Sequence, residues 1–289
     1  MVKVKTKKLK KAAVCCLGLA ALGGFCWWQN NGLMLTRYSY CLPAGLEGLN
    51  GVCIAHISDL HNKDFDGSLV QLLKKAKPDL VVITGDIVGC TDADFAPALA
   101  LAEQCASLAP TCYVPGNHEG ALFFQGAYGQ LRQELIGRGV HVLENQSFTL
   151  DVEGGSLHVI GLLDPLFSGK SLERAGEEMT LLIAREKREG MLNLVLSHRP
   201  SLISAYAAGG ADLVFCGHAH GGQVRLPLVG GLIAPDEGFF PTYTSGVFQQ
   251  GNTTEVVSRG LGNSRVPLRL FNRPELVLLD LKSEKSQVP

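Results

Sequence analysis

The sequence predicts a layered α/β domain behind an N-terminal apolar segment. Between residues 52 and 216, short apolar runs alternate with amphipathic stretches, as strands and helices do in layered folds. The run Leu-Val-Val-Ile-Thr at 80–84 is nearly continuous, which is typical of a strand covered on both faces. Beyond residue 220, helical periodicity disappears among glycine-rich turns. We therefore expect an α/β unit with an added β half.

Each element follows from its local pattern. Apolar runs bounded by turn residues predict strands at 52–58, 80–84, 111–114, 147–152, 157–163, 192–196, 212–216, 224–226, 243–248, 253–258 and 275–281. Helical periodicity predicts helices at 67–76, 92–108, 128–138, 171–189 and 200–208. Gly154 and Gly155 separate two alternating runs and indicate a hairpin over 147–163.

The charge of the chain is unevenly distributed. Its 289 residues are 46% hydrophobic, which suits one globular domain of ordinary size. Six of the 26 basic residues lie in residues 1–11, so the remaining chain has 20 basic and 27 acidic residues, a net charge of −7. An acidic body is a poor match for a phosphate backbone, and we expect no nucleic-acid partner.

The N-terminal region carries a membrane signal. Residues 1–11 form a basic tail, and residues 12–28 form an uncharged apolar run that ends in Trp27-Trp28. An uncleaved anchor and a cleaved secretory signal both fit this pattern, and we favour the anchor because no small-x-small cleavage site precedes Trp27. Lysines before an anchor stay in the cytoplasm. We therefore expect a single-pass cell-membrane protein with an extracytoplasmic domain at 51–289, joined by a linker at 29–50 that includes an entry strand or loop, since residues 36–40 alternate weakly.

The nine cysteines show neither paired Cys-x-x-Cys motifs nor the spacing of a disulfide framework. We expect free and mostly buried thiols, which fits a strongly oxidising compartment less well. This expectation is in tension with an extracytoplasmic location.

Side chains that bind metals recur where predicted strands end. They are Asp59 and His61 after the first strand, Asp86 after the second, Asn117, His118 and Glu119 after the third, His198 after 192–196, and His218 and His220 after 212–216. The carboxyl ends of strands carry the site in sheets of this kind, and glycines at 85, 116 and 217 allow tight turns. Neutral imidazole and carboxylate are usual ligands of borderline divalent metals. The pattern therefore predicts a metal site.

The order of these motifs resembles the calcineurin-like metallophosphoesterases. Five blocks occur in the family order: Asp-x-His, Gly-Asp, Gly-Asn-His-Glu, a lone His, and Gly-His-x-His. Residues 258–263 (Ser-Arg-Gly-Leu-Gly-Asn) and 270–274 (Leu-Phe-Asn-Arg-Pro) look like the membrane-anchored bacterial branch. The resemblance covers about residues 50–281. It implies a four-layer αββα sandwich of two mixed β-sheets flanked by helices.

The resemblance also implies two divalent ions, which the ligand types leave open as Mn, Fe or Zn. The first ion would be held by Asp59, His61, Asp86 and His220, and the second by Asp86, Asn117, His198 and His218. Bridging by Asp86 is chemically sensible, because a neutral imidazole has only one free lone pair. Two divalent ions and two carboxylates leave a charge of about +2, which attracts phosphate.

Three neighbours of these ligands have open roles. His118 is expected to be the catalytic general acid that protonates the leaving oxygen, or else it only supports a turn. Glu119 either supports the site or is a solvated turn acid. Arg199 either binds the phosphate of the substrate by bidentate contacts or forms a surface ion pair.

We expect a metal-dependent hydrolase of phosphoester or pyrophosphate bonds, acting as a phosphodiesterase on a membrane-associated, amphiphilic or lipid-linked substrate. The substrate expectation rests on apolar residues at 121–124, 230–235 and 239–241, which form either core packing or an exposed rim. The alternative is a non-catalytic, partner-binding scaffold on the same fold. The full ligand set argues against that alternative, because a scaffold needs neither His118 nor two metal shells.

Overall fold

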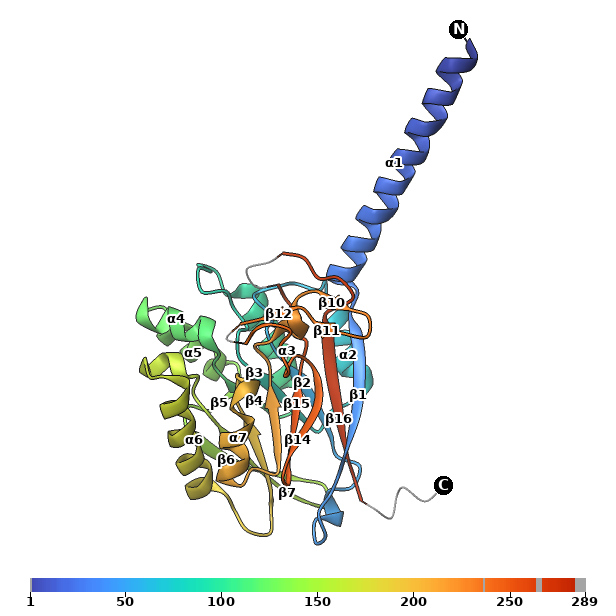
Figure 1. Ribbon diagram of the computed structural model, residues 1–289. Helices are drawn as coiled ribbons and strands as arrows, with labels where there is room; N and C mark the ends of the chain where they lie inside the picture. Colours follow the sequence, from blue (N-terminus) through green and yellow to red (C-terminus); the bar gives the residue numbers. More distant parts are fainter. Residues whose placement is uncertain (1, 236, 264–266, 284–289) are drawn as a thin grey trace.

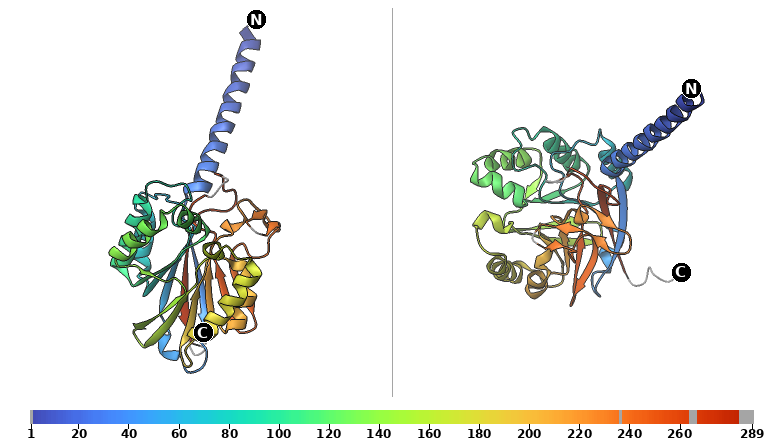
Figure 2. Two further views of the ribbon diagram at one scale, coloured as in Figure 1. Left: turned by 90° about the vertical axis from the view of Figure 1, so that its left-hand side faces the viewer. Right: turned by 45° about the horizontal axis from the view of Figure 1, so that its top comes forward.

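The computed structural model describes residues 2–235, 237–263 and 267–283. Two six-stranded mixed sheets lie face to face, and helices cover the outer face of each (Figures 1 and 2). The expected αββα sandwich is confirmed. A helix at the N-terminus projects away from this body.

The first sheet contains the strands that precede the first three motif blocks. Its order is β1 (Met34–Cys41), β16 (Glu275–Lys282), β2 (Cys53–Ile57), β3 (Leu80–Thr84), β4 (Thr111–Val114) and β5 (His141–Val142). β2 to β5 run parallel to one another, whereas β16 is antiparallel to β2 and parallel to β1.

The second sheet contains the strands that precede the last two blocks. Its order is β14 (Gly246–Gln250), β15 (Thr253–Val257), β9 (Leu213–Cys216), β8 (Leu192–Leu196), β7 (Gly155–Gly161) and β6 (Gln146–Val152). The four inner strands are parallel, and β14 and β6 are antiparallel edges. The pairing of β6 with β7 confirms the predicted hairpin.

Alternating side chains fill three apolar layers. Val82 of β3 points to the core between the sheets, where it meets Phe215 and other residues of the second sheet. Its neighbours Val81 and Ile83 point outward to the helices. Those helices are α2 (Ser68–Ala76), α3 (Ala96–Leu108), α4 (Asn117–Phe124) and α5 (Tyr128–Gly137) on the first sheet, and α6 (Leu172–Glu186) and α7 (Ile203–Gly209) on the second.

Short elements connect these layers. The 3₁₀ turns are η1 (Glu47–Leu49), η2 (Pro165–Ser168), η3 (Pro200–Leu202) and η4 (His220–Gly222). Two small hairpins follow η4, formed by β10 (Arg225–Leu226) with β11 (Gly230–Gly231) and by β12 (Ile233–Ala234) with β13 (Gly238–Phe239). They lie at the end of the domain from which the N-terminal helix leaves (Figure 1).

Several elements differ from the sequence-based expectation: β5, β11, β12 and β13 were not predicted, and the strand expected at 243–248 is β14 at Gly246–Gln250. The entry strand or loop expected within the linker is the edge strand β1, whose partly exposed face leaves only a weak alternation in sequence. α3 begins at Ala96 instead of residue 92, because the carboxylate of Asp94 accepts the N–H of Ala96 and Pro97 stands in the first turn. Residues 117–124 form α4, which was not predicted.

The N-terminal helix α1 (Val2–Asn31) is longer than the apolar run seen in sequence. Its part Lys11–Asn31 has 21 residues, and the most apolar 18-residue window in it has a mean hydropathy of 1.5, with 6% of that window buried in the structure. At 1.5 Å per residue it spans about 31 Å, close to the hydrocarbon core of a bilayer. By length and composition it is a candidate membrane span, although a signal sequence passes the same test.

Candidate metal centre

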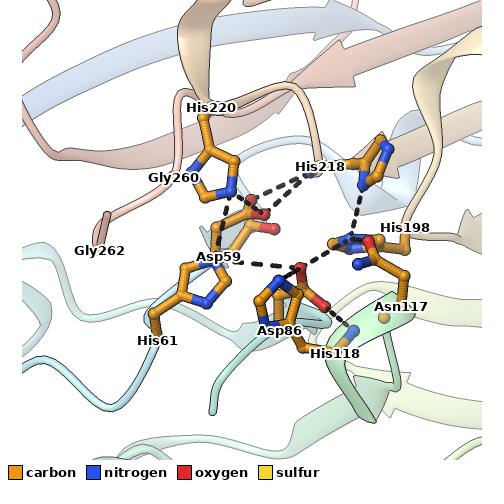
Figure 3. Close-up of polar contacts among 12 residues, drawn as sticks. Asp59, His61, Asp86, Asn117, His118, His198, His218, His220, Gly260 and Gly262 are labelled. Carbon is orange, nitrogen blue, oxygen red and sulfur yellow. Dashed lines mark hydrogen bonds and ion pairs between the residues drawn. The ribbon is translucent and has the colours of Figure 1, made fainter. Parts of the chain in front are cut away.

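The carboxyl ends of five strands, from both sheets, meet at one end of the sandwich (Figure 3). All seven expected ligands lie directly beyond these strands. Asp59 and His61 follow β2, Asp86 follows β3, Asn117 begins α4 after β4, His198 follows β8, and His218 and His220 follow β9.

The side chains form two clusters that share one carboxylate. Ligand atoms of the first cluster lie within 4.8 Å of one another, and so do those of the second. The first cluster contains Asp59, His61, Asp86 and His220, and the second contains Asp86, His198 and His218. The amide oxygen of Asn117 lies 3.1 Å from Nε2 of His198 and so adjoins the second cluster.

The spacing of the ring nitrogens fits a bound cation. Nε2 of His61 lies 3.2 Å from Nε2 of His220, and Nδ1 of His218 lies 3.2 Å from Nε2 of His198. Two nitrogens bound at 2.0–2.1 Å to one ion, at about a right angle, lie roughly 3 Å apart. Each pair could therefore hold one ion together with Asp86.

Burial and charge also suit cations. Burial lowers the pKa of His61 to about 3 and that of His220 far below its ordinary value, so both rings are neutral and keep a lone pair for a metal. Burial lowers the pKa of His198 as well, but the charges of Asp86 and Asp59 outweigh it and raise this pKa to about 10. The two carboxylates thus create a negative field that a cation would offset.

Five of the seven residues have left-handed backbone conformations. The φ angles are 51° at Asp59, 46° at His61, 51° at Asp86, 65° at His218 and 49° at His220. Each such residue costs on the order of 1–3 kcal/mol, and strain of this kind gathers at functional sites. Hydrogen bonds stabilise the turns: the Asp59 carboxylate accepts the His218 N–H at 3.1 Å, and Asp86 accepts the His118 N–H at 2.8 Å.

Two glycines let backbone approach the centre. A Cβ at Gly217 would lie 1.8 Å from Oγ of Ser58 and 2.4 Å from Oδ2 of Asp59. A Cβ at Gly262 would lie 2.1 Å from the carbonyl oxygen of Leu60. The segment 258–263 therefore packs directly behind the first metal cluster, which explains the glycines of that motif.

Glu119 supports the shared carboxylate. Its side chain is fully buried and accepts the N–H groups of Asp86 (2.8 Å), Ile87 (2.9 Å) and Gly116 (2.7 Å). The alternative of a solvated turn acid is wrong. Glu119 fixes the turns after β3 and β4 relative to each other.

Replacing Glu119 by glutamine should loosen these turns. Glutamine has one acceptor oxygen, so at least one of the three N–H groups meets an amide NH₂, at a cost of about 1–3 kcal/mol. We expect chemical denaturation to show this loss, and metal titration to show weaker binding. Glu178→Gln on α6, where the acid is half exposed and pairs with Lys170, is the matched control and should change stability by less than about 0.5 kcal/mol. Equal effects of the two changes would contradict the supporting role.

His118 lies at the edge of the centre. Its Nδ1 accepts the backbone N–H of Cys90 at 2.9 Å, which leaves the single ring proton of a neutral imidazole on Nε2. That Nε2 lies 3.9 Å from Oδ2 of Asp86, and the side chain is 16% exposed, whereas that of Asp86 is 2% exposed. His118 can therefore offer a proton to a ligand that enters from solvent.

Arg199 lies in a buried ion pair. Its Nε and Nη2 donate to the two carboxylate oxygens of Asp164 at 2.6 and 3.1 Å. The ion-pair alternative describes this arrangement, although the pair is buried and not on the surface. A contact from Arg199 to substrate phosphate remains a prediction.

Two further residues support His220 and were not found from the sequence. Arg269 is fully buried, donates to the carbonyl oxygens of Gly262 and Arg259, and places Nη2 3.5 Å from Nδ1 of His220. The side chain of Asn272 donates to the carbonyl oxygen of His220 at 2.7 Å. Asn272 belongs to the motif at 270–274, which was the available signal for its role.

An αββα sandwich with two carboxylate–imidazole clusters at its strand ends defines a metallophosphoesterase. The chain belongs to the calcineurin-like phosphoesterase family, whose model matches residues 53–222, and it is a hydrolase of this class.

Curated relatives match most of the chain. It is 32% identical over 253 residues to the uncharacterized metallophosphoesterase YkuE of Bacillus subtilis, covering 86% of this chain and 84% of the relative. It is 31% identical over 242 residues to phosphodiesterase YaeI of Escherichia coli, covering 79% and 81%. A transmembrane protein with a metallophosphoesterase domain from Bos taurus is 26% identical, covering 81% and 54%.

A solved structure supports the fold. The phosphopantetheinyl hydrolase PptH of Mycobacterium tuberculosis aligns with a TM-score of 0.50 and 14% identity, over 75% of this chain and 92% of that one. At this identity the likeness concerns the architecture alone.

Proposed function

We propose that this protein is a dinuclear-metal-dependent phosphodiesterase that acts on an amphiphilic phosphoester at a membrane. The observation that carries the proposal is the pair of clusters sharing Asp86. The relative in Escherichia coli that is named a phosphodiesterase supports the choice of diester over monoester or pyrophosphate.

The residues of the metal centre would have different roles in the reaction. One ion would be held by Asp59, His61, Asp86 and His220, and the other by Asp86, Asn117, His198 and His218. When bound, two such ions supply Lewis acidity for the phosphoryl oxygens and a lowered pKa for the attacking water. His118 would donate a hydrogen bond from its Nε2–H to the leaving oxygen and so stabilise the charge that grows as the bond breaks. Glu119, Arg269 and Asn272 keep the ligands in place.

Metal removal tests the hydrolase against the scaffold alternative. We expect the full chain, purified in detergent, to cleave a chromogenic phosphodiester, to lose turnover after chelation and to regain it with Mn²⁺. Zn²⁺ and Fe²⁺ arms of the same titration identify the preferred metal. A chain that binds metal with no turnover on any phosphodiester, phosphomonoester or pyrophosphate would support the scaffold.

The substrate proposal rests on exposed aromatic side chains. Phe239, the last residue of β13, and Phe240 after it are 71% and 62% exposed, so core packing does not account for them. Phe123 and Phe124, at the end of the helix α4 that carries His118, are also exposed. We call Phe239 and Phe240 the apolar rim. Exposed apolar groups near a polar site suit a substrate with a hydrocarbon part.

Changing the rim should affect amphiphilic substrates selectively. In the double variant Phe239→Ser plus Phe240→Ser, we expect kcat/KM for a long-chain phosphodiester to fall about tenfold, since partial loss of aromatic contact costs about 1.4 kcal/mol. A short, water-soluble diester has no hydrocarbon part to lose and should be cleaved with a much smaller change. An equal fall of kcat/KM on both substrates would contradict a role of the apolar rim in binding the hydrocarbon part of the substrate.

We also propose a location for the protein in the cell. The basic tail at 1–11 and the apolar part of α1 support a single-pass anchor with the domain outside the cytoplasm. Protease added to intact cells should digest the domain. Protection until the cells are broken would reverse the orientation.

A further inference from the structure

We propose that the end of the domain carrying the metal clusters lies against the bilayer that α1 crosses, with two apolar turn tips in the lipid interface. The first tip is Leu228 and Val229, between β10 and β11, and the second is the apolar rim. This orientation rests on the proposed role of α1 as a membrane anchor. It adds an interaction surface, the lipid, and fixes how the site faces its substrate.

The end of α1 is bonded to the domain and is not a flexible tether. The side-chain oxygen of Asn30 accepts the N–H of Arg269 at 3.0 Å and a side-chain N–H of Asn263 at 3.1 Å. The backbone oxygen of Asn30 accepts a hydrogen bond from Lys63. Only two residues separate α1 from β1. The direction of α1 is therefore set by contacts with the same segment that packs behind the first metal cluster.

The apolar surface of α1 continues onto the domain. The ring of Phe25 in α1 lies 5.9 Å from the ring of Phe271 and 6.1 Å from that of Trp28, measured between centroids. The guanidinium of Arg273 lies over Trp28 at 4.6 Å. Tryptophans at the end of a span lie at the membrane–water interface. Phe271, which is half exposed, is thus at the level of that interface.

The turn tips lie on the same side of the domain. The hairpins that carry them lie at the end of the domain from which α1 leaves (Figures 1 and 2), and the strands β2, β3, β8 and β9 carry their metal ligands just beyond their carboxyl ends. Leu228 is completely exposed, and Val229 is 60% exposed. A bilayer around α1 would face the end of the domain that carries these side chains.

The backbone of these exposed residues is strained. Leu228, Phe240 and Phe271 have φ angles of 68°, 55° and 52°. Left-handed conformations are rare for bulky residues and cost free energy. Exposure of an apolar side chain to water does not offset that cost. Insertion in lipid would offset that cost, because it removes the apolar side chains from water. The backbone strain, the exposure of the side chains and their continuity with α1 together favour lipid as the partner of the turn tips.

The orientation explains how an amphiphilic phosphoester reaches the site. Its hydrocarbon part would stay in the bilayer beside the tips while its phosphate reaches the strand ends that carry the metal ligands. Asn117, His118 and His61 are partly exposed, whereas the other expected ligands are buried. The side of the metal centre on which these three residues lie is therefore open to solvent.

Tryptophan quenching in nanodiscs tests the contact directly. The full chain carrying Phe239→Trp is compared with the full chain carrying Leu181→Trp, because both native side chains are 71% exposed and Leu181 lies on α6. Signal from Trp27 and Trp28 is measured in the wild type and subtracted. In discs of brominated lipid we expect about twofold quenching of the new tryptophan at 239 and none at 181. Val229→Trp on the other tip repeats the test in case the first change disturbs folding.

Equal quenching at 239, 229 and 181 would overturn the orientation. Absence of quenching at the tips, together with a tryptophan blue shift that grows with protein concentration, would assign them to a second copy of the chain and would also overturn it. Turnover of a soluble phosphodiester by the wild type in the same discs is read separately. Quenching without turnover refutes the proposed hydrolysis alone, and turnover without quenching refutes the orientation alone.

Discussion

Replacing Asp86 by asparagine is expected to abolish turnover and to lower the occupancy of both metals. Asp86 belongs to both clusters, and its Oδ2 lies 3.3 Å from Nε2 of His198 and 4.0 Å from Nε2 of His61. Asparagine offers one neutral oxygen in place of two that share a negative charge. Changes to groups that only support metal ligands already cost about 10–100-fold in metal affinity, so a shared ligand should cost at least as much.

Metal content per chain and kcat on a chromogenic phosphodiester measure this effect. Asp280→Asn is the matched control, because Asp280 pairs with the exposed Arg37 at the edge of the first sheet. It should keep both metals and normal turnover. Near-normal activity of the Asp86 variant would refute the shared role of this carboxylate.

His118→Asn is expected to keep both metals and to slow poor leaving groups far more than nitrophenolate. His118 offers its Nε2–H toward the site, and a hydrogen bond to developing negative charge is worth about 10²–10³-fold where the leaving oxygen is strongly basic. Nitrophenolate is a stable anion without a proton, so kcat/KM for the nitrophenyl phosphodiester should fall much less. The measurement is kcat/KM for a nitrophenyl and an alkyl phosphodiester on metal-matched protein.

His141→Asn serves as the control for this change. His141 is exposed on β5 and stacks on Phe148, with a ring-centroid distance of 4.2 Å. The variant should retain both activities. If His118→Asn lost the same factor on both substrates, the residue would stabilise the site without donating to the leaving group.

The ligand set was accessible to sequence analysis because each ligand lies within a few residues of a strand end. A buried strand and a tight turn leave a local signature, as in Val-Phe-Cys-Gly-His before His220. The resemblance added the pairing of blocks into two clusters. The sandwich itself also required the resemblance, since alternation alone indicated only layered α/β.

Features that depend on distant contacts were not accessible. β1 pairs with β16 at the other end of the chain, and its own weak alternation left a strand and a loop both open. Arg269 supports His220 from 49 residues away, and neither residue has a pattern that refers to the other. The left-handed turns at Asp59 and Asp86 could not be foreseen, because aspartate gives no local signal for a strained backbone stabilised by tertiary hydrogen bonds.

Anomalous scattering from crystals of Mn²⁺-loaded protein is the most direct test of the central claim, that seven side chains together bind two cations. We expect two peaks of similar height. One should lie among Asp59, His61, Asp86 and His220, and the other among Asp86, Asn117, His198 and His218. A single peak, or peaks away from Asp86, would contradict the dinuclear centre.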